Sequence, residues 1–335
     1  MLPQALLLVI LMNINVASTS NIIKTLPGFR GDLPFKLETG YVGVGAMDAV
    51  QLFYYFFESE GSPEYDPLVL WLNEGPGCST FFGFVYENLG PLSFDYLNSI
   101  GNKPKLKLNP YSRTKMNLWA LDSHMQKLNI SDTLSAVQTY EFLRKWLMDQ
   151  PKFYNNPLYI AGDSYSGITL PIVVQEISDG NRDEHLPPMN LKGYVIGNPV
   201  TDTQIDRNYR SMKRNCKGEY MNVDLNNTLC VDDLEVYNER SIKEWEICNK
   251  TLQDLYISDV SSSLVYHENL IKQGYRVLIY SGDHDMNIPY VSTMGWIESL
   301  NLTVDSRWKP WFLHEQVAGL GAGHTAPEYK PEECC

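Results

Sequence analysis

Short continuous hydrophobic runs, each followed by glycine and polar residues, recur along the chain. They lie at 68–72 and 157–161, and again at the start of the stretches 191–199 and 275–289. Runs of this length that stop at glycine-containing loops are typical of strands buried on both faces of a sheet. Residues 37–58 hold two further β-rich runs around a glycine-containing turn, which predicts a hairpin that opens the domain.

The hydrophobic spacing changes to a helical period in two segments. The first begins with the cap Ser131-Asp132, ends before Pro151, and has apolar residues at Leu134, Val137, Tyr140, Leu143 and Leu147. Residues 167–178 show a similar period, with Pro171 in the first turns. Strands that alternate with helices predict a mainly parallel sheet with helices on both faces and functional loops at the carboxyl ends of its strands.

The chain is predicted to divide into a short leader and one large domain. An apolar run from Ala5 to Met12, followed by small residues, predicts a cleavable secretory signal at 1–20, although no Lys or Arg precedes the run. This run is too short to span a bilayer, and no later segment reaches the required length. Residues 21–335 are predicted to form a single domain, in which the polar stretch 202–262 is a shortened cap inserted over the sheet.

Composition and charge narrow the functional classes. Of 335 residues, 44% are hydrophobic, which is enough for a sizeable core. The 40 acidic residues exceed the 27 basic ones and give a net charge of −13, with no basic patch in the sequence. Nucleic acid is therefore excluded as a partner, because its phosphates would be repelled.

Two features agree with an oxidising secretory compartment. Four tripeptides match the N-glycosylation pattern, at Asn129, Asn226, Asn249 and Asn301. The six cysteines (Cys78, Cys216, Cys230, Cys248, Cys334 and Cys335) can form bridges there, in a connectivity that spacing alone leaves open. The adjacent cysteines at the C-terminus could instead suggest a metal, but no His or Cys lies at ligand spacing around them, so we predict no metal site.

Ser164 lies between a predicted strand and a predicted helix, where a nucleophile elbow would place it. An elbow needs small neighbours and aims the next backbone N–H at the developing oxyanion. Gly162-Asp163-Ser164-Tyr165 fits this pattern, but Ser166 stands at the second glycine position and Gly167 follows one place late. Serine is small enough to pack there; the alternative is a Gly-Ser loop without a catalytic role.

A nucleophilic serine needs a basic histidine and a carboxylate that orients it, and both occur downstream in the order expected of an α/β-hydrolase. Asp283 and Asp285 compete for the acid, while His284 between them is expected to pack locally or face solvent. His324, in a glycine-rich loop, is the expected base. Of the other histidines, we expect His124, His185 and His267 to be solvated and His314 to lie in a strand or at the edge of the core.

Four motifs occur along the chain in the order "LWLNEGPGCST", "GDSYSG", "YSGDHDMNIP" and "GAGHTAPEYKPEEC". Together they resemble the serine carboxypeptidase family, and more closely its plant serine carboxypeptidase-like branch, over about 23–334. The resemblance implies an α/β-hydrolase fold. It also implies a role for each matched residue: Ser164 as nucleophile, Asp285 as orienting acid, His324 as base, the N–H groups of Gly75 and Tyr165 as the oxyanion hole, and Asn73 and Asp163 as ligands of the substrate's C-terminal carboxylate. No cofactor is implied.

The resemblance further implies disulfides between Cys78 and Cys248 and between Cys216 and Cys230. The implied activity is release of C-terminal residues from peptides through an acyl-serine, with a peptide or small ester as substrate, in the cell exterior or a vacuole. Acidic pH should favour peptide cleavage, because the Asp163 carboxyl can donate a hydrogen bond to a carboxylate only when it is protonated. The oligomeric state is left open.

The chain departs from the family at four places. Peptidases carry Glu before the nucleophile, whereas Asp163 resembles the plant members that transfer acyl groups from glucose esters, so acyl transfer is the alternative activity. Glu74 replaces a glycine of the oxyanion loop, which is expected to weaken binding of anionic substrates.

The other two departures are deletions. The run "Pro-Val-Gly-x-Gly-Phe-Ser-Tyr" is missing after Leu121-Asp122, and Gln316 joins His324 without the strand pair that relatives place before the histidine. Without that strand pair, the sequence leaves open whether His324 comes within hydrogen-bond distance of Ser164. A non-catalytic relative is therefore a second alternative, and a lipase or esterase is less favoured because a His-Gly-Gly-Gly loop is absent.

Overall fold

The computed structural model describes residues 20–72, 75–85, 89–95, 97–99, 104–112, 115–124, 130–210 and 248–334. All of the predicted signal segment except Ser20 lies outside these ranges. Asn73, Glu74, Asn129, Cys216, Asn226, Cys230 and Cys335 also lie outside them.

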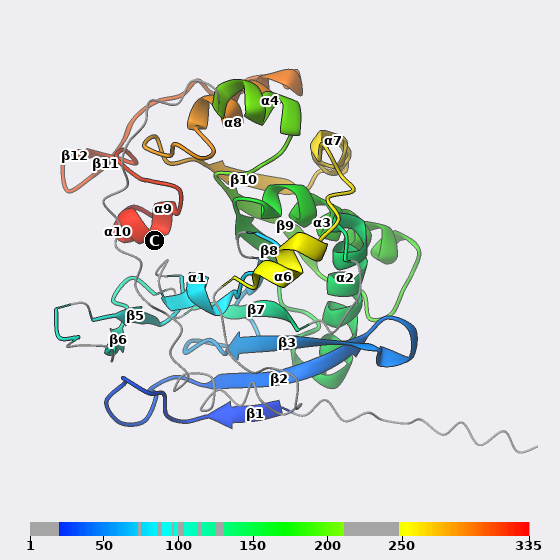
Figure 1. Cartoon of the computed structure of the whole chain (residues 1–335), viewed down its shortest axis with the longest axis vertical. Helices are drawn as coiled ribbons and strands as arrows, with labels where there is room; N and C mark the ends of the chain where they lie inside the picture. The colour runs from blue at the N-terminus through cyan, green and yellow to red at the C-terminus, as the bar shows by residue number, and fades with distance from the viewer. Residues whose placement is uncertain are drawn as a thin grey trace, which may run out of the picture.

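An eight-stranded sheet forms the centre of the molecule, in the order β1-β2-β3-β7-β4-β8-β9-β10 (Figure 1). Its strands are β1 (Ser20–Ile23), β2 (Leu37–Val44), β3 (Val50–Phe57), β4 (Leu68–Leu72), β7 (Asn117–His124), β8 (Leu158–Asp163), β9 (Leu191–Gly197) and β10 (Arg276–Tyr280). The first three are antiparallel, and β7, β4, β8, β9 and β10 are mutually parallel. The predicted hairpin and the four predicted strands are confirmed.

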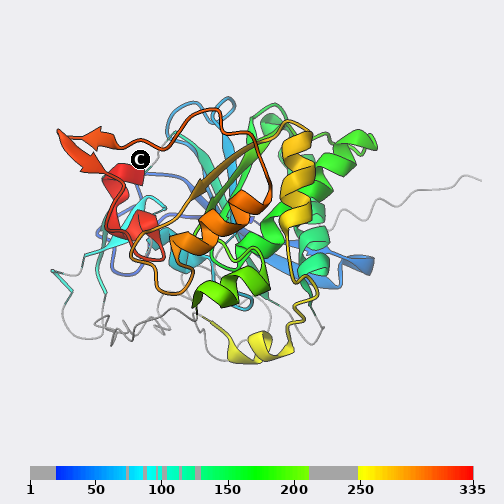
Figure 2. The ribbon, with the colours of Figure 1, turned by 90° about the horizontal axis from the view of Figure 1, so that it is seen from above.

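The helices join these strands in the predicted alternation. They are α1 (Phe81–Val85), α2 (Asp132–Asp149), α3 (Ser166–Arg182), α4 (Thr203–Arg210), α6 (Lys250–Leu255), α7 (Leu264–Lys272), α8 (Tyr290–Ser299), α9 (Ala326–Tyr329) and α10 (Pro331–Cys334), with 3-10 turns η1 (Ala46–Asp48) and η2 (Pro151–Phe153). Two small sheets pair β5 (Leu92–Phe94) with β6 (Leu106–Leu108) and β11 (Trp311–Leu313) with β12 (Gln316–Ala318). The red C-terminal segment lies on one side of the molecule, and α2, α3 and α7 gather on the other (Figure 2).

Both faces of the sheet are covered, as the continuous hydrophobic runs predicted. Alternate residues of β3 enter two cores: Leu52, Tyr54 and Phe56 pack with α2, α3 and α7, whereas Phe53, Tyr55 and Phe57 pack with α1 and β5. A strand buried on both faces has no polar positions to alternate with apolar ones, which explains the uninterrupted pattern.

Helix α2 has the predicted limits, and its buried face includes the predicted Leu143 and Leu147 but neither Leu134 nor Val137. Ser131 caps it by accepting a hydrogen bond from the N–H of Leu134. Leu134 and Val137 are 39% and 43% exposed, so their assignment to the apolar stripe was wrong. Phe142 and Trp146 are buried instead, and the Trp146 ring packs against Phe56 and Trp119 of the sheet, because these large rings contribute more apolar area than the smaller side chains.

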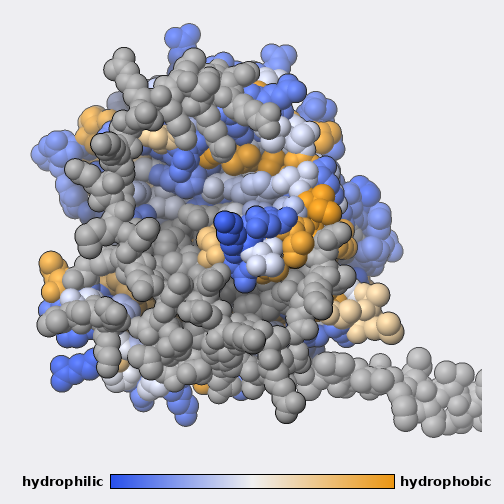
Figure 3. Space-filling model, viewed as in Figure 1, coloured by the Kyte–Doolittle hydropathy of each residue, from blue (hydrophilic) through white to orange (hydrophobic). Residues whose placement is uncertain are grey.

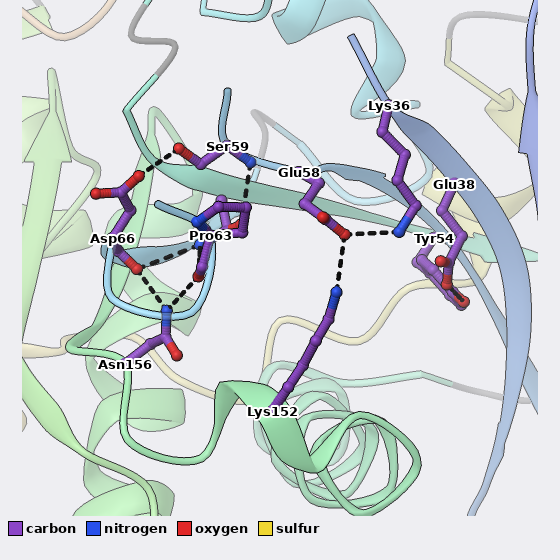
Figure 4. Close-up of polar contacts among 10 residues, drawn as sticks. Lys36, Glu38, Tyr54, Glu58, Ser59, Pro63, Asp66, Lys152 and Asn156 are labelled. Carbon is purple, nitrogen blue, oxygen red and sulfur yellow. Dashed lines mark hydrogen bonds and ion pairs between the residues drawn. The ribbon is translucent and has the colours of Figure 1, made fainter. Parts of the chain in front are cut away.

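Polar contacts fasten the antiparallel half of the sheet to η2. Glu58, just after β3, accepts hydrogen bonds from the amines of Lys36 at 2.6 Å and Lys152 at 3.1 Å (Figure 4). Partial burial would raise the pKa of Glu58, but the two lysines outweigh it and hold that pKa below its ordinary value. The Asn156 amide donates to the main-chain oxygens of Pro63 and Asp66, each at 2.7 Å.

No helix in the part of the chain that the structure describes is long and apolar enough to cross a bilayer. On the face shown in Figure 3, hydrophobic side chains form separate groups among hydrophilic ones. The structure describes both ends of the predicted cap, through α4 and α6, whereas 211–247 lie outside its ranges; the boundaries 202–262 remain a prediction.

Candidate active site

Four neighbouring strands, β4, β8, β9 and β10, end at one edge of the sheet, and their next residues converge there. The loops after them carry Gly75, Ser164, Asn198 and Asp285, respectively. This convergence follows from parallel pairing, because parallel strands place all their carboxyl ends on the same side.

Ser164 sits on a sharp turn between β8 and α3. Its φ of 54° is in the left-handed region, which is strained for a residue with a Cβ. The turn is held by main-chain hydrogen bonds from Ser164 N to Gly197 O at 3.0 Å and from Val200 N to Ser164 O at 2.8 Å. The chain therefore has the strand-turn-helix geometry of a nucleophile elbow.

Small residues allow the elbow to pack against its neighbours. A Cβ on Gly162 would lie 2.4 Å from Leu72 O, and one on Gly167 would lie 2.3 Å from Val200 O. The late glycine is thus required by close backbone approach. Ser166 fits the intervening position because it is buried and its hydroxyl donates to Asp163 O at 2.5 Å.

A proline in the second turn of α3 is tolerated because its missing hydrogen bond is replaced. Pro171 has no N–H to donate to Gly167 O, four residues earlier. The Ser263 hydroxyl donates to that oxygen at 2.7 Å. Helix α3 can therefore begin directly at the elbow and keep its position.

Ser164, His324 and Asp285 are brought together by the fold. His324 Nε2 lies 2.8 Å from Ser164 Oγ, and His324 Nδ1 lies 2.6 Å from Asp285 Oδ2. The Asp285 side chain is 1% exposed and the His324 side chain 21%. The deletion does not leave His324 out of reach of Ser164: β11 and β12 form a short hairpin before it, and the following glycine-rich loop returns to the sheet edge.

Asn198 orients the carboxylate and was missed in the sequence. Its Nδ2 donates to Asp285 Oδ2 at 2.8 Å, and its Oδ1 accepts from Gly282 N at 3.0 Å. The main-chain N–H of Asn287 donates to Asp285 Oδ1 at 2.7 Å. Asn198 comes immediately after β9, whose end lies between the ends of β8 and β10. This position points to a role in the site, but it can be recognised only when the strand order is known.

Asp283, the competing acid, has a different function in the structure. Its Oδ1 accepts from Gly321 N at 2.7 Å and Ala322 N at 3.1 Å, in the loop that leads to His324. A Cβ on Gly282 would lie 2.0 Å from Gly323 O, so this glycine is needed for the close approach of the two loops. Asp283 and Gly282 therefore hold the loop that carries His324 against the loop that carries Asp285.

Gly75 and Tyr165 line the same cavity, of about 130 Å³, at this sheet edge. A disulfide joins Cys78 of the Gly75 loop to Cys248, as the resemblance implied. Asn249 N also donates to Gly77 O at 2.8 Å. Asp163, which precedes the elbow, is only 1% exposed.

Two expectations for other histidines were wrong. His267 is fully buried in α7, where Nδ1 lies 2.6 Å from Tyr194 Oη and the ring stacks on Trp296. Burial lowers its pKa to about 4. His314 lies in the exposed turn between β11 and β12, with Nε2 2.7 Å from Glu332 Oε1, because the hairpin projects from the core.

The remaining predicted positions are surface features. His185 and His284 are exposed, and the side chain of His124 lies outside the described residues. Asn301 is in an exposed turn after α8, and Asn249 caps α6 by accepting from Leu252 N. Among the described residues, no cluster of three or more His, Cys, Asp or Glu side chains is arranged to hold a metal ion.

A mainly parallel sheet with its serine on a strand-turn-helix elbow, followed along the chain by aspartate and then histidine, defines the α/β-hydrolase fold. The crystal structure of Kex1, a prohormone-processing carboxypeptidase from Saccharomyces cerevisiae, has the same fold. It superposes with a TM-score of 0.75 at 16% identity and covers 92% of each chain.

Sequence comparisons then identify the family. Residues 27–219 and 210–335 match the family model for serine carboxypeptidase. Serine carboxypeptidase-like 12 and 16 of Arabidopsis thaliana are 38% and 41% identical to this chain, over 99% of it and 96% of their own lengths. The chain belongs to the serine carboxypeptidase family. These alignments extend over 419 and 421 positions, more than the chain's 335 residues, so the relatives contain segments that it lacks.

Proposed function

We propose that the protein is a serine carboxypeptidase-type hydrolase that releases C-terminal residues from peptides through an acyl-serine. The observation that carries this proposal is the hydrogen-bonded series Ser164–His324–Asp285, with distances of 2.8 and 2.6 Å. A serine hydroxyl is a weak nucleophile at its ordinary pKa and attacks only when a neighbouring base accepts its proton.

In the proposed reaction, Ser164 Oγ bonds to the carbonyl carbon of the last peptide bond while His324 Nε2 takes the hydroxyl proton. Asp285 stabilises the imidazolium, and the N–H groups of Gly75 and Tyr165 stabilise the oxyanion. The C–N bond then breaks and His324 gives the proton to the leaving amine. Water, deprotonated by His324, attacks the acyl-serine, releases the shortened peptide and restores the hydroxyl.

Acyl transfer to an alcohol is the second candidate, and Asp163 is the residue that favours it. This side chain is one methylene shorter than the glutamate of the peptidases and is almost fully buried, so it is poorly placed to bind a peptide carboxylate. Both reactions form the same acyl-serine and differ in whether water or an alcohol resolves it.

The experiment compares a blocked dipeptide with a hydroxycinnamoyl glucose ester, each at acidic and neutral pH, using wild type and Ser164→Ala. We expect wild type to cleave the dipeptide, faster at acidic pH, and Ser164→Ala to be inactive and unlabelled by a fluorophosphonate. Turnover of the ester alone would replace peptide cleavage by acyl transfer. A purified protein with normal circular dichroism and no labelling would indicate a non-catalytic relative.

We further propose that the protein works in the cell exterior or a vacuole, after removal of residues 1–20. The Cys78–Cys248 disulfide supports an oxidising compartment. Glycosylation at Asn129, Asn226, Asn249 and Asn301 and the pairing of Cys216 with Cys230 belong to the same proposal. Mass spectrometry of the secreted protein, before and after deglycosylation and reduction, tests these modifications together.

A further inference from the structure

A buried carboxylate, Asp132, lies at the start of α2 and has no part in the proposed proton transfers. It is fully buried. Its Oδ1 accepts hydrogen bonds from the phenols of Tyr165 and Tyr256, both at 2.8 Å, and its Oδ2 accepts from Val260 N at 2.9 Å. Three donors from two segments distant in sequence therefore converge on one carboxylate.

The first of these donors belongs to the residue after Ser164. Tyr165 begins the turn into α3, and its main-chain N–H is the proposed oxyanion donor next to the nucleophile. At the far end of its side chain, Oη is held by Asp132 and forms a second hydrogen bond with Ser258 Oγ at 2.8 Å. The Tyr165 ring also packs edge-on against Tyr256, with centroids 6.0 Å apart. Both ends of this residue are consequently fixed.

The other donors lie in residues 248–260, which we name the strap; its helix α6 is the yellow helix of Figure 1. One end of the strap is tied to the Gly75 loop by the Cys78–Cys248 disulfide. The other end is tied to the start of α2, where Ile257 N donates to Ile130 O at 2.7 Å and Thr133 Oγ1 donates to Asp259 at 2.5 Å.

The strap thus contacts both halves of the proposed oxyanion hole. It is joined to the Gly75 loop by the disulfide. It is joined to Tyr165 directly, by Ser258 and the Tyr256 ring, and also through Asp132. Burial raises the pKa of both Tyr165 and Tyr256 above the ordinary value, so their phenols remain protonated donors to the carboxylate. An oxyanion hole requires its two N–H groups at a fixed separation, because small displacements of a donor reduce stabilisation of the transition state.

We propose that Asp132 is a positioning residue of the oxyanion hole. It acts through Tyr165 and the strap to keep the N–H groups of Tyr165 and Gly75 at a fixed separation. This inference rests on the proposed acyl-serine chemistry but not on the choice between peptide and ester substrates.

The test uses Asp132→Asn, Tyr256→Phe and a matched pair from elsewhere in the sheet. Glu38 is also a buried carboxylate that accepts from a tyrosine, Tyr54 Oη, at 2.7 Å, and lies among the β2–β3 contacts (Figure 4). Glu38→Gln and Tyr54→Phe alter the same kind of hydrogen bond near Phe142, in the middle of α2, without touching Asp132, the strap or the elbow.

Active sites are first counted by complete fluorophosphonate labelling, and kcat and KM are then measured per labelled site, together with thermal unfolding. We expect Asp132→Asn to lower kcat about 10- to 100-fold with KM nearly unchanged, and Tyr256→Phe to lower it about three- to tenfold. The double variant should be no worse than Asp132→Asn alone, because both changes break one network. Glu38→Gln and Tyr54→Phe should lose stability but keep kcat.

A normal kcat per site in both Asp132→Asn and Tyr256→Phe would overturn the inference and leave Asp132 with a purely structural role. If Asp132→Asn does not fold, Tyr256→Phe decides. If wild type turns over neither substrate but is labelled, the proposed activity fails, and the labelling rate constants of the same variants decide on Asp132. An unlabelled wild-type serine would overturn both proposals.

Discussion

Replacing Gly282 by alanine should disconnect His324 from Ser164 while leaving the sheet folded. Gly282 lies in the loop after β10, and its φ is not in the region reserved for glycine, so alanine introduces a steric effect only. Its Cβ would lie 2.0 Å from Gly323 O and 2.5 Å from Ala322 O. Both contacts are main-chain atoms, which cannot rotate away.

The size of the effect follows from these distances. Ordinary contacts begin at 3.4 Å, so the loop that carries Gly323 must move by roughly 1.4 Å. His324 is the next residue and moves with it, which stretches the 2.8 Å hydrogen bond to Ser164 toward 4 Å. A misplacement of about 1 Å reduces catalysis on the order of 100-fold. We therefore expect kcat per labelled site to fall about 100-fold.

Gly193→Ala is the matched control for this variant. Its Cβ would lie 2.1 Å from Arg276 O, between β9 and the start of β10, which is the end of the strand away from the histidine loop. Both variants should therefore unfold at lower temperature than wild type, but only Gly282→Ala should lose turnover. Equal turnover per site in the two variants would refute the reasoning that loop contact at Gly282 sets the position of His324.

Three further outcomes are expected. Asn198→Ala should lower kcat about 10- to 100-fold, measured per labelled site with unchanged circular dichroism, because Asp285 loses a 2.8 Å donor; a normal kcat would show that Asn287 N alone suffices. Because burial lowers the pKa of His267 from 6.5 to about 4, the folded state binds fewer protons than the unfolded state between these values. The free energy of unfolding is therefore unaffected by this group above pH 6.5 and falls by up to about 3 kcal/mol as pH is lowered toward 4. In urea unfolding, His267→Gln should lack this decrease; a free energy of unfolding that depends on pH equally in the variant and in wild type would contradict it. Cys248→Ser should lower stability by about 2–5 kcal/mol, and a reductant should shift the thermal unfolding of this variant less than that of wild type; an equal shift in the two proteins would locate the sensitivity to reductant elsewhere.

The strands and the nucleophile turn could be predicted because their signals are local. A run such as 68–72 is hydrophobic on both faces wherever it lies, and Ser164 stands at the junction of two different periods. The full buried face of α2 could not be predicted in the same way, although Leu143 and Leu147 were placed on it correctly. Which side of a helix is buried depends on its partners, and Trp146 is turned inward by Phe56 and Trp119 of distant strands.

The reach of His324 was also beyond the sequence. The short segment from Gln316 to His324 indicated that the strand pair which relatives place before the histidine is missing. In the structure, the β11–β12 hairpin and the close approach of Gly282 to Gly323 bring the loop that carries His324 back to the sheet edge. Asn198 illustrates the same limit, because an asparagine after a strand gains its meaning from the neighbouring strand ends. His267 was wrongly expected to be solvated since its polar neighbours Glu268 and Asn269 occupy the exposed side of the same helix.

The proposed base follows a largely exposed segment, while its serine partner lies between two largely buried elements, β8 and α3. Most residues from 311 to 320 are exposed, whereas α3 and β8 are largely buried. A protease that trimmed this C-terminal region, or a modest denaturant concentration that frayed it, would silence the enzyme with its central sheet still intact. Inactivation should therefore precede global unfolding in this protein, and far-ultraviolet spectra alone would overestimate the fraction of competent molecules.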